Sequence, residues 1–234
     1  MTPTAPITVL VPSRGRPGNI EQLIDAWVST AAGGYAELVV IVDDDDPHVA
    51  AYQAVDYPAE FAELVIGPRL RLGGTLNHYA PAAAYRSLAV GFLGDDHRPR
   101  SMRWDQTIYE TVAAGRHVVA YGNDLIQGPA LPTAVFLSSS IINTVGYFVP
   151  PGMTHLFLDN YWRRLGETLG SLRYLPDVII EHVHPIAGRA AWDDGYTEVN
   201  APAVWTADET RFSQYVADGE FAAAITRLST TEVY

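Results

Sequence analysis

The stretch Leu88-Ala-Val-Gly-Phe-Leu-Gly-Asp-Asp-His97 is an apolar run that ends abruptly in two carboxylates and an imidazole. A run of this length flanked by glycine is typical of a buried parallel strand. Open α/β sheets bind their ligands outside the carboxyl ends of the strands, so Asp95 and Asp96 are expected where a metal ion and a phosphate bind. The structural alternative is a strand that runs into an acidic turn, and a motif this short does not separate the two by itself.

The composition is that of a globular protein that binds anions locally, if at all. The chain has 234 residues, of which 48% are hydrophobic and 18% charged, enough for one large core. Its formal net charge of -12 argues against general binding to nucleic acid or anionic membranes, which requires clustered Lys and Arg. The sequence has no cysteine, so any metal ion must be held by oxygen or imidazole ligands.

Targeting and membrane signals are missing from the sequence. The N-terminus lacks a basic region followed by a long apolar segment, and no apolar stretch is long enough to span a bilayer. We therefore expect a soluble, unprocessed protein, and the lack of cysteine suits a cytoplasmic location.

From Ile7 onward, short apolar runs alternate with amphipathic segments, which is the pattern of a parallel sheet covered by helices. Strands are predicted at 7–11, 38–42, 64–66, 88–93 and 117–120. Helices are predicted from about residue 19, and at 49–54, 72–84 and 104–114.

Beyond Gly122 this rhythm changes, because glycine and proline residues interrupt a mixed region. We place a smaller subdomain here, with a helix at 159–169, a strand at 178–183 and one C-terminal helix at 208–228. The predicted organisation is an α/β half over 1–125 and a second region over 126–234, within one continuous globular domain.

The polar loops after the first, second and fourth strands are expected to lie together. In a right-handed βαβ series these loops open on the same edge of the sheet, where they would converge on one ligand. The second strand ends in Asp43-Asp-Asp-Asp46. This run is either a solvated turn that caps the next helix or a source of carboxylates that accept hydrogen bonds from a base or ribose.

Basic residues near the same edge are candidate phosphate ligands. Arg69 and Arg71 precede the helix at 72–84, and Arg14 and Arg16 lie in the first loop. Guanidinium groups match phosphate geometry in a bidentate manner, whereas the structural alternative is a set of surface charges.

The second half adds two histidines and an aspartate. In Val178-Ile-Ile-Glu-His-Val-His184, alternation along a strand places His182 and His184 on one face. An Asp and a His around one ion, completed by phosphate oxygens, suit Mn²⁺ or Mg²⁺, although an isolated histidine is more often structural. Asp159 starts a predicted helix, where it is either an N-cap or a general base.

Taken together, these motifs resemble those of GT-A glycosyltransferases, in the broad family-two group that transfers sugars from nucleotide-sugar donors. The resemblance rests on Ile7-Thr-Val-Leu-Val-Pro-Ser-Arg14, Asp43-Asp44, Arg71-Leu-Gly-Gly-Thr-Leu-Asn77 and Gly94-Asp-Asp-His97, in the family's order. Gly94-Asp-Asp-His-Arg-Pro-Arg100 and Trp104-Asp105 are similar in particular to small glycosyltransferases of actinobacterial phages. The resemblance implies a GT-A fold, a Rossmann-like, mostly parallel sheet flanked by helices, with a smaller acceptor-side subdomain.

The resemblance also implies roles for single residues. The donor-binding set would be Pro12, Ser13, Arg14, Asp43, Asp44, Arg71 and Asp95, with Asp95 on the ribose and Arg71 on the base or diphosphate. Asp96 would bind the metal ion directly, together with His182 or His184, and Asp159 would be the catalytic base. The chain has His97 where the family most often has the last Asp of an Asp-x-Asp triplet, which makes His97 a further candidate ligand. Many relatives also show Glu-Asp where this chain has the single Asp159.

The predicted activity is an inverting, metal-dependent transfer of a sugar from a nucleoside-diphosphate sugar to an acceptor hydroxyl, with Mn²⁺ or Mg²⁺ as cofactor. The alternatives are a nucleotidyltransferase and a non-catalytic nucleotide- or carbohydrate-binding module. An NAD-dependent dehydrogenase is disfavoured because no Gly-x-Gly-x-x-Gly follows the first strand. The sugar, the nucleotide and the acceptor stay open, the acceptor being a protein, a glycan or a small molecule. Neither nucleic acid nor a membrane is expected as a partner, and a phage protein would act in the host cytoplasm.

Overall fold

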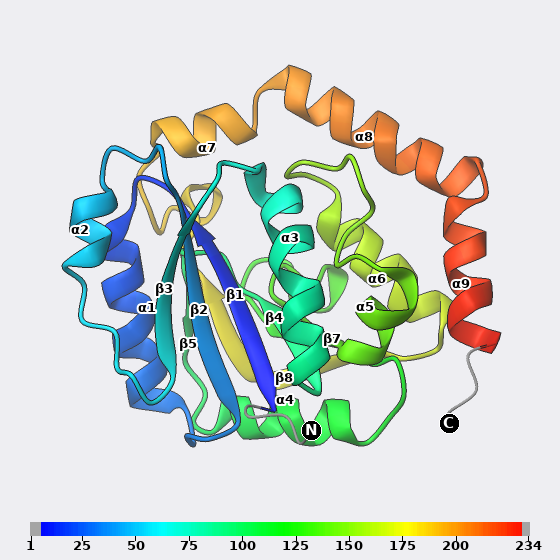
Figure 1. The fold of residues 1–234 in the computed structure, drawn as a ribbon, viewed down its shortest axis with the longest axis horizontal. Coiled ribbons are helices and arrows are strands. Elements are labelled where there is room, and N and C mark those ends of the chain that lie inside the picture. The colour runs from blue at the N-terminus through cyan, green and yellow to red at the C-terminus, as the bar shows by residue number, and fades with distance from the viewer. Residues whose placement is uncertain (1–5, 231–234) are drawn as a thin grey trace.

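An eight-stranded sheet with helices on both faces makes up the computed structural model, which describes residues 6–230 (Figure 1). The strands, in spatial order, are β3-β2-β1-β4-β7-β6-β8-β5. Their bounds are β1 Ile7–Ser13, β2 Ala36–Asp43, β3 Ala62–Gly67, β4 Ala89–Phe92, β5 His97–Pro99, β6 Val119–Asn123, β7 Val135–Ser138 and β8 Leu172–His182.

Six of these strands run in one direction. β3, β2, β1 and β4 are mutually parallel, and β6 and β8 share their direction, because β7 lies antiparallel to both β4 and β6. Only β7 and β5 run the other way. The carboxyl ends of the six strands therefore meet at one edge, and the predicted convergence of the first, second and fourth loops is confirmed.

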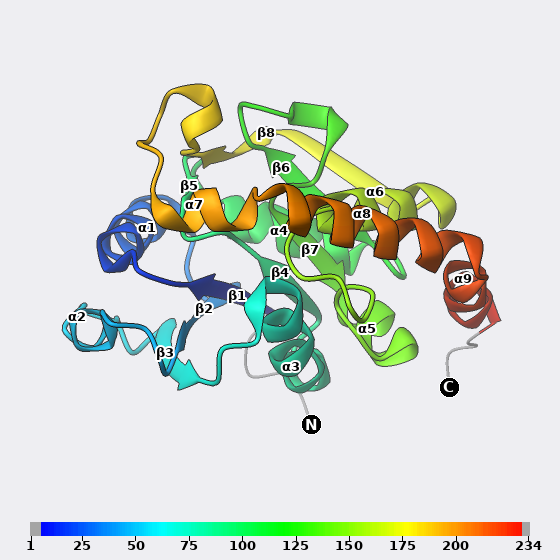
Figure 2. The ribbon, with the colours of Figure 1, turned by 90° about the horizontal axis from the view of Figure 1, so that it is seen from above.

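Helices cover both faces of the sheet, which gives the predicted α/β layers (Figure 2). Alternate residues of each strand face opposite ways, so Val9 and Val40 belong to a core beneath α1 and α4, while Leu10 and Val39 belong to a second core beneath α3 and α5. The helix bounds are α1 Pro17–Thr30, α2 Val49–Gln53, α3 Arg71–Arg86, α4 Trp104–Ala113, α5 Ser139–Val145, α6 Leu158–Thr168, α7 Asp194–Val199, α8 Pro202–Ala217 and α9 Glu220–Thr230.

The predicted helix at 72–84 is confirmed by α3, although two glycines lie in its first turn. Position 73 requires glycine because the backbone of the 150–157 loop packs against it. An added Cβ would lie 2.1 Å from the carbonyl oxygen of Met153. The N–H of Gly73 also donates to the carbonyl of Thr154 over 2.8 Å. The start of α3 is thereby fixed to the loop that precedes α6.

The second half of the chain departs from the predicted elements. The strand predicted at 178–183 begins earlier, at Leu172, and the strand predicted at 117–120 begins only after His117, whose φ of 54° does not fit a strand. The single C-terminal helix predicted at 208–228 is wrong. It is two helices, because the chain turns at Gly219, which has a φ of 83°.

Two strands of this sheet, β5 and β7, and two helices, α5 and α7, were not predicted. All four residues of β7 are buried, and the strand lies between β4 and β6. Strands from the second half of the chain thus complete a sheet that the first half begins.

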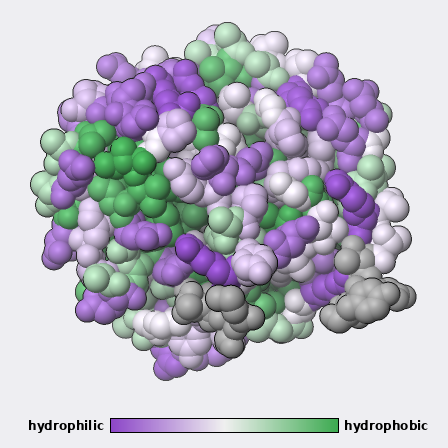
Figure 3. Space-filling view, in the orientation of Figure 1, coloured by the Kyte–Doolittle hydropathy of each residue, from purple (hydrophilic) through white to green (hydrophobic). Residues whose placement is uncertain are grey.

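The carboxyl edge is the upper edge in Figure 1, where α7 and the start of α8 cross it. Hydrophilic side chains occupy much of this edge, whereas hydrophobic surface gathers in the region of β2 and β3 (Figure 3). Within residues 6–230, no helix has the length and apolar character needed to cross a membrane.

Candidate functional site

Asp96, His97 and His182 form a cluster at the carboxyl edge of the sheet. β5 pairs antiparallel with the end of β8, which places His97 opposite His182 with their rings stacked 4.3 Å apart. Asp96 Oδ2 lies 3.3 Å from His182 Nε2, and Asp96 Oδ1 lies 3.4 Å from His97 Nδ1. Asp96 is 7% exposed and His97 is 2% exposed, so the cluster is largely shielded from water.

The geometry of this cluster fits a divalent metal ion. One nitrogen or oxygen atom from each of the three residues lies within 4.8 Å of the others. Ligands bound at about 2.1 Å to one ion are spaced roughly 3 Å apart, close to the separations seen here. His97 Nδ1 accepts from the N–H of Gly94, a hydrogen bond that it would give up to bind an ion, while its buried Nε2 has no hydrogen-bond partner among the described residues. Mixed imidazole and carboxylate ligands suit a transition metal such as Mn²⁺.

The electrostatics of the cluster favour cation binding. Burial alone would raise the pKa of Asp96, but its interactions with the imidazoles of His182 and His97 outweigh burial and hold that pKa well below the usual range. Burial, together with neighbouring His182, lowers the pKa of His97. At neutral pH the cluster therefore offers a charged carboxylate and a neutral imidazole, the forms that bind metal ions.

Asp95 lies beside this cluster but contacts different residues. It is 6% exposed, its Oδ2 accepts from Ser13 over 2.7 Å and its Oδ1 from Arg16 over 3.3 Å. Burial and the charge of Asp96 raise the pKa of Asp95 to about 6. Ser13 Oγ also pairs with the hydroxyl of Tyr52 over 2.7 Å. The structure thus joins Ser13 to Asp95, which the sequence separates widely.

The four aspartates after β2 have different surroundings. Asp43 accepts from Arg14 over 3.0 Å, and burial raises its pKa. Asp46 is buried and accepts from the N–H of Gly15 over 2.7 Å, which ties the loop after β2 to the loop after β1. Asp44 is exposed. Pro12 is half-buried near the end of β1, so the predicted donor-binding residues of β1 and β2 share this corner of the site.

Arg71 forms no hydrogen bond with Asp95 or Asp96. It begins α3 with a φ of 62°, and its guanidinium binds Glu198 of α7. Arg69 binds the same carboxylate over 3.2 Å. Both arginines reach the carboxyl edge, as predicted, and both bind α7; Arg69 also lies 3.8 Å from Asp43 at the end of β2.

His184 lies near the metal-binding cluster but outside it. Its ring is 4.9 Å from that of His182, consistent with the predicted common face. Its Nδ1 accepts from the N–H of Ile186 over 3.2 Å. The three-residue cluster contains His97 instead.

Asp159 lies half-buried in the first turn of α6, within electrostatic reach of His182. Its interpretation as an N-cap is wrong, because Phe157 holds the N-cap position and Asp159 Oδ1 accepts from the adjacent N–H of Asn160. Burial raises the pKa of Asp159; the hydrogen bond from Asn160 and, to a smaller extent, nearby His182 oppose this shift. A carboxylate with a raised pKa near the cation-binding cluster is suited to accept a proton.

Two residues that position the site were not predicted. Asp208 of α8 is 1% exposed and accepts from the N–H groups of Thr154, His155 and Leu156, each over 2.8 Å, which fixes the loop before Asp159. In sequence it is indistinguishable from a surface acid of an amphipathic helix. Buried Arg98 donates to the carbonyls of Asp95 and His97, each over 2.7 Å. Its place directly after the Asp-Asp-His motif was a usable signal.

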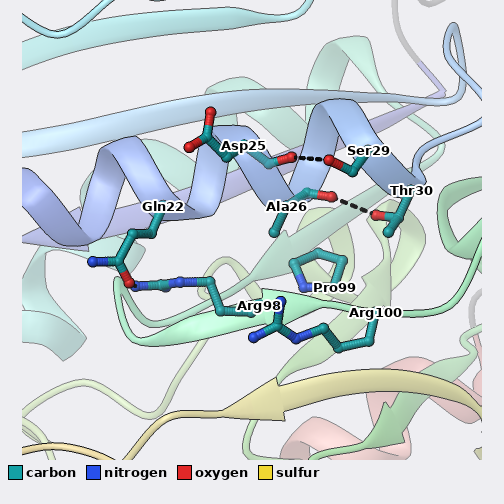
Figure 4. Close-up of a pocket in the computed structure, with 8 residues that line it drawn as sticks. All are labelled: Gln22, Asp25, Ala26, Ser29, Thr30, Arg98, Pro99 and Arg100. Carbon is teal, nitrogen blue, oxygen red and sulfur yellow. Dashed lines mark hydrogen bonds between the residues drawn. The ribbon is translucent and has the colours of Figure 1, made fainter.

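Two cavities adjoin Arg98. The smaller, about 200 Å³, lies beside Asp96 and is also lined by Arg16 and Tyr196. The larger, about 320 Å³, lies between α1 and β5 (Figure 4). None of the residues predicted to bind donor or metal lines the larger cavity, so the smaller one belongs to the candidate site.

Comparisons with solved structures establish the fold. No protein-family model and no curated protein matches the chain. The mannosyltransferase PcManGT from Pyrobaculum calidifontis, in complex with GDP-Man and Mn²⁺, is 16% identical with a TM-score of 0.59, over 97% of this chain and 79% of that one. Glucosyl-3-phosphoglycerate synthase from Mycobacterium tuberculosis, in complex with Mn²⁺, UDP and phosphoglyceric acid, is 14% identical with a TM-score of 0.59, over 88% and 78% of the chains. TarS 1-349 from S. aureus, in complex with UDP-GlcNAc, is 12% identical with a TM-score of 0.58, over 94% and 74%.

At these identities the likeness concerns the backbone, and it agrees with the sheet order and helix layers described above. The predicted fold class is confirmed: the chain has the GT-A fold that these glycosyltransferases share.

Proposed function

We propose that this protein is a metal-dependent glycosyltransferase that moves a sugar from a nucleoside-diphosphate sugar to an acceptor hydroxyl, with inversion at the anomeric carbon. The observation that carries the proposal is the cluster of Asp96, His97 and His182 at the carboxyl edge of a GT-A sheet, with Asp95 beside it. Solved structures with this fold hold Mn²⁺ together with GDP-Man or UDP.

The donor site of the proposal lies at the ends of β1, β2 and β4. Pro12, Ser13 and Asp44 would surround the nucleobase, and Arg14 and Asp43 would complete the donor-binding set beside them. Asp95 would accept a hydrogen bond from the ribose, and a carboxylate suits this task because it only accepts when ionised. Arg71 would bind the diphosphate once its present partner, Glu198, has left it.

The metal ligands of the proposal are Asp96 and His182, with His97 or His184 as the further protein ligand. A bound Mn²⁺ or Mg²⁺ would supply positive charge against the diphosphate leaving group. The surrounding residues exclude water from this charge, because Asp96 and His97 are buried. A low local dielectric strengthens such charge stabilisation.

Asp159 is the proposed general base. It would take the proton of the acceptor hydroxyl as the acceptor oxygen bonds to the anomeric carbon. The bond from that carbon to the diphosphate oxygen breaks on the opposite face, and the electron pair leaves with the nucleoside diphosphate. The products are the glycosylated acceptor, the nucleoside diphosphate and a proton held on Asp159.

The decisive experiment measures ligand binding and product release with and without Mn²⁺. We expect GDP- or UDP-sugars to raise the melting temperature only with the metal, since a ligand specific for the native state stabilises it. Asp96→Asn should remove this metal-dependent stabilisation. Asp105→Asn is the matched control, because Asp105 is also buried but binds the N–H groups of Ala32 and Gly33 away from the site.

The products separate this proposal from the other activities. Release of nucleoside diphosphate, with the sugar on an acceptor or on water, supports glycosyl transfer. Release of pyrophosphate from a nucleoside triphosphate supplied with a sugar phosphate would indicate a nucleotidyltransferase, and tight binding without any product would indicate a binding module. Near-normal turnover in Asp96→Asn would contradict the assigned metal site.

A further inference from the structure

Residues 193–198, which we call the strap, lie on the groups that the proposed donor would contact. Asp193 binds Arg16 in a bidentate pair with both N···O distances at 2.7 Å. Tyr196 donates its hydroxyl to Asp96 Oδ2 over 2.8 Å. Glu198 binds Arg71 and Arg69. The strap therefore contacts the metal-binding cluster and two separate guanidinium sites at once.

The strap is negatively charged, as a nucleoside diphosphate is. It contains three carboxylates and no basic residue. A carboxylate and a phosphate bind guanidinium in the same bidentate manner, so Asp193 and Glu198 occupy positions that phosphate oxygens would take. Arg16 also lies 3.3 Å from Asp95, which joins its anion site directly to the Asp95-Asp96 pair.

Polar and aromatic contacts, rather than either hydrophobic core, hold the strap in place; the Tyr196 ring also packs edge-on against His184, with 4.8 Å between the ring centroids. Tyr196 is its only buried residue, and Tyr196 belongs to neither of the two hydrophobic clusters. The Tyr196 ring lies under the Arg16 guanidinium, 3.8 Å from ring centroid to the guanidinium carbon. A segment with little buried apolar surface opens at low free-energy cost, and an anionic ligand would compete for the same arginines.

We propose that the strap is an internal occupant of the donor site, which a nucleoside diphosphate must displace, and that Arg16 is a further diphosphate-binding residue. This inference rests on the proposed function. The strap lowers the apparent affinity for the donor, because only the fraction of molecules with the strap displaced can bind. Loosening the strap therefore tightens donor binding, whereas removing the arginines weakens it.

The two sides of the Arg71–Glu198 ion pair provide the test. Calorimetric titration of UDP and of GDP, each with Mn²⁺, measures the affinity of wild type, Glu198→Gln and Arg71→Met. Glu198→Gln should bind about two- to fivefold tighter, since exposed ion pairs are weak. Arg71→Met should bind at least roughly fivefold more weakly, because a hydrogen bond to a charged group is lost. Opposite signs at one ion pair are not expected of a purely structural contact.

Asp193→Asn and Arg16→Met repeat the test at the second anion site, with the same opposite signs expected. The matched control is Glu167→Gln, because Glu167 also pairs with an arginine and its side chain is 51% exposed, against 47% for Glu198. This control should leave nucleotide affinity unchanged, and thermal unfolding without nucleotide verifies that each variant is folded.

The outcomes distinguish the strap from the proposed function. Tighter binding by Glu198→Gln, or binding by that variant alone, supports the strap. Nucleotide binding by wild type with equal or weaker binding by Glu198→Gln overturns the strap and leaves the proposed function intact. Failure of wild type and all variants to bind either nucleotide overturns both.

Discussion

Replacing Asp208 by Asn should destabilise the protein and loosen the loop that leads to the proposed base. Asp208 is 1% exposed; its Oδ1 accepts from the N–H of Thr154, and its Oδ2 from those of His155 and Leu156. Asparagine keeps one carbonyl oxygen and turns an amide N–H₂ group toward the other donors. The oxygen can take the place of Oδ2 and keep the bonds from His155 and Leu156, so the N–H of Thr154 loses its charged acceptor, at a cost of about 1.5–3 kcal/mol.

Urea denaturation of Asp208→Asn against wild type measures this loss, with the slope m expected to be unchanged. Hydrogen exchange should speed up at residues 154–160 more than in the sheet, and kcat should fall more than donor affinity, because Asp159 loses its fixed position. The neighbouring Glu209→Gln is the control, since Glu209 is exposed on the same helix. A loss below about 0.5 kcal/mol in Asp208→Asn, the level of an ordinary surface substitution, would refute the reasoning.

Three further results are expected. Tyr196→Phe removes the hydroxyl that donates to Asp96 Oδ2, so Mn²⁺ should bind about two- to tenfold tighter, as measured by electron paramagnetic resonance without nucleotide. Weaker binding would mean that the hydroxyl supports the ion. Burial raises the pKa of Asp159, and a general base works only when deprotonated. On acidification kcat should therefore fall with a midpoint above the ordinary aspartate pKa of about 3.9. An ordinary midpoint would argue against Asp159 as the general base. Gly91→Ala places a Cβ 2.7 Å from the buried ring of Phe136 and should lower the free energy of unfolding in urea by about 1–3 kcal/mol. An unchanged free energy would show that the ring can move.

Local sequence patterns predicted the first half of the fold well for a physical reason. Strands such as β1 and β2 are continuous apolar runs, and polar turns separate them from amphipathic helices such as α1. β7 was missed because a four-residue buried run, followed at once by α5, has no period of its own. β5 was missed because His97-Arg-Pro99 has no apolar residue of strand type, and pairing with β8 alone makes it a strand.

The sequence predicted some residues of the candidate site, but it did not predict their contacts. Asp95 and Asp96 were recognised because they follow the end of a strand, and the carboxyl ends of parallel strands are ligand-binding positions. The tertiary structure separates their surroundings, since Ser13 and Arg16 contact Asp95 while His182 and Tyr196 contact Asp96. These contacts join residues far apart in the chain, so no local pattern predicts them.

By itself, the sequence determined the α/β class, the acidic strand end and the residue types available to a metal ion and a diphosphate, because these depend on hydrophobic periodicity and side-chain chemistry. Only the tertiary structure decided that His97, opposite His182 in the β5–β8 pair, joins Asp96 in the metal-binding cluster. It also decided that the strap lies on Arg16 and Arg71. Both depend on where distant segments pack, which is set by the free energy of the whole fold rather than by neighbours in sequence.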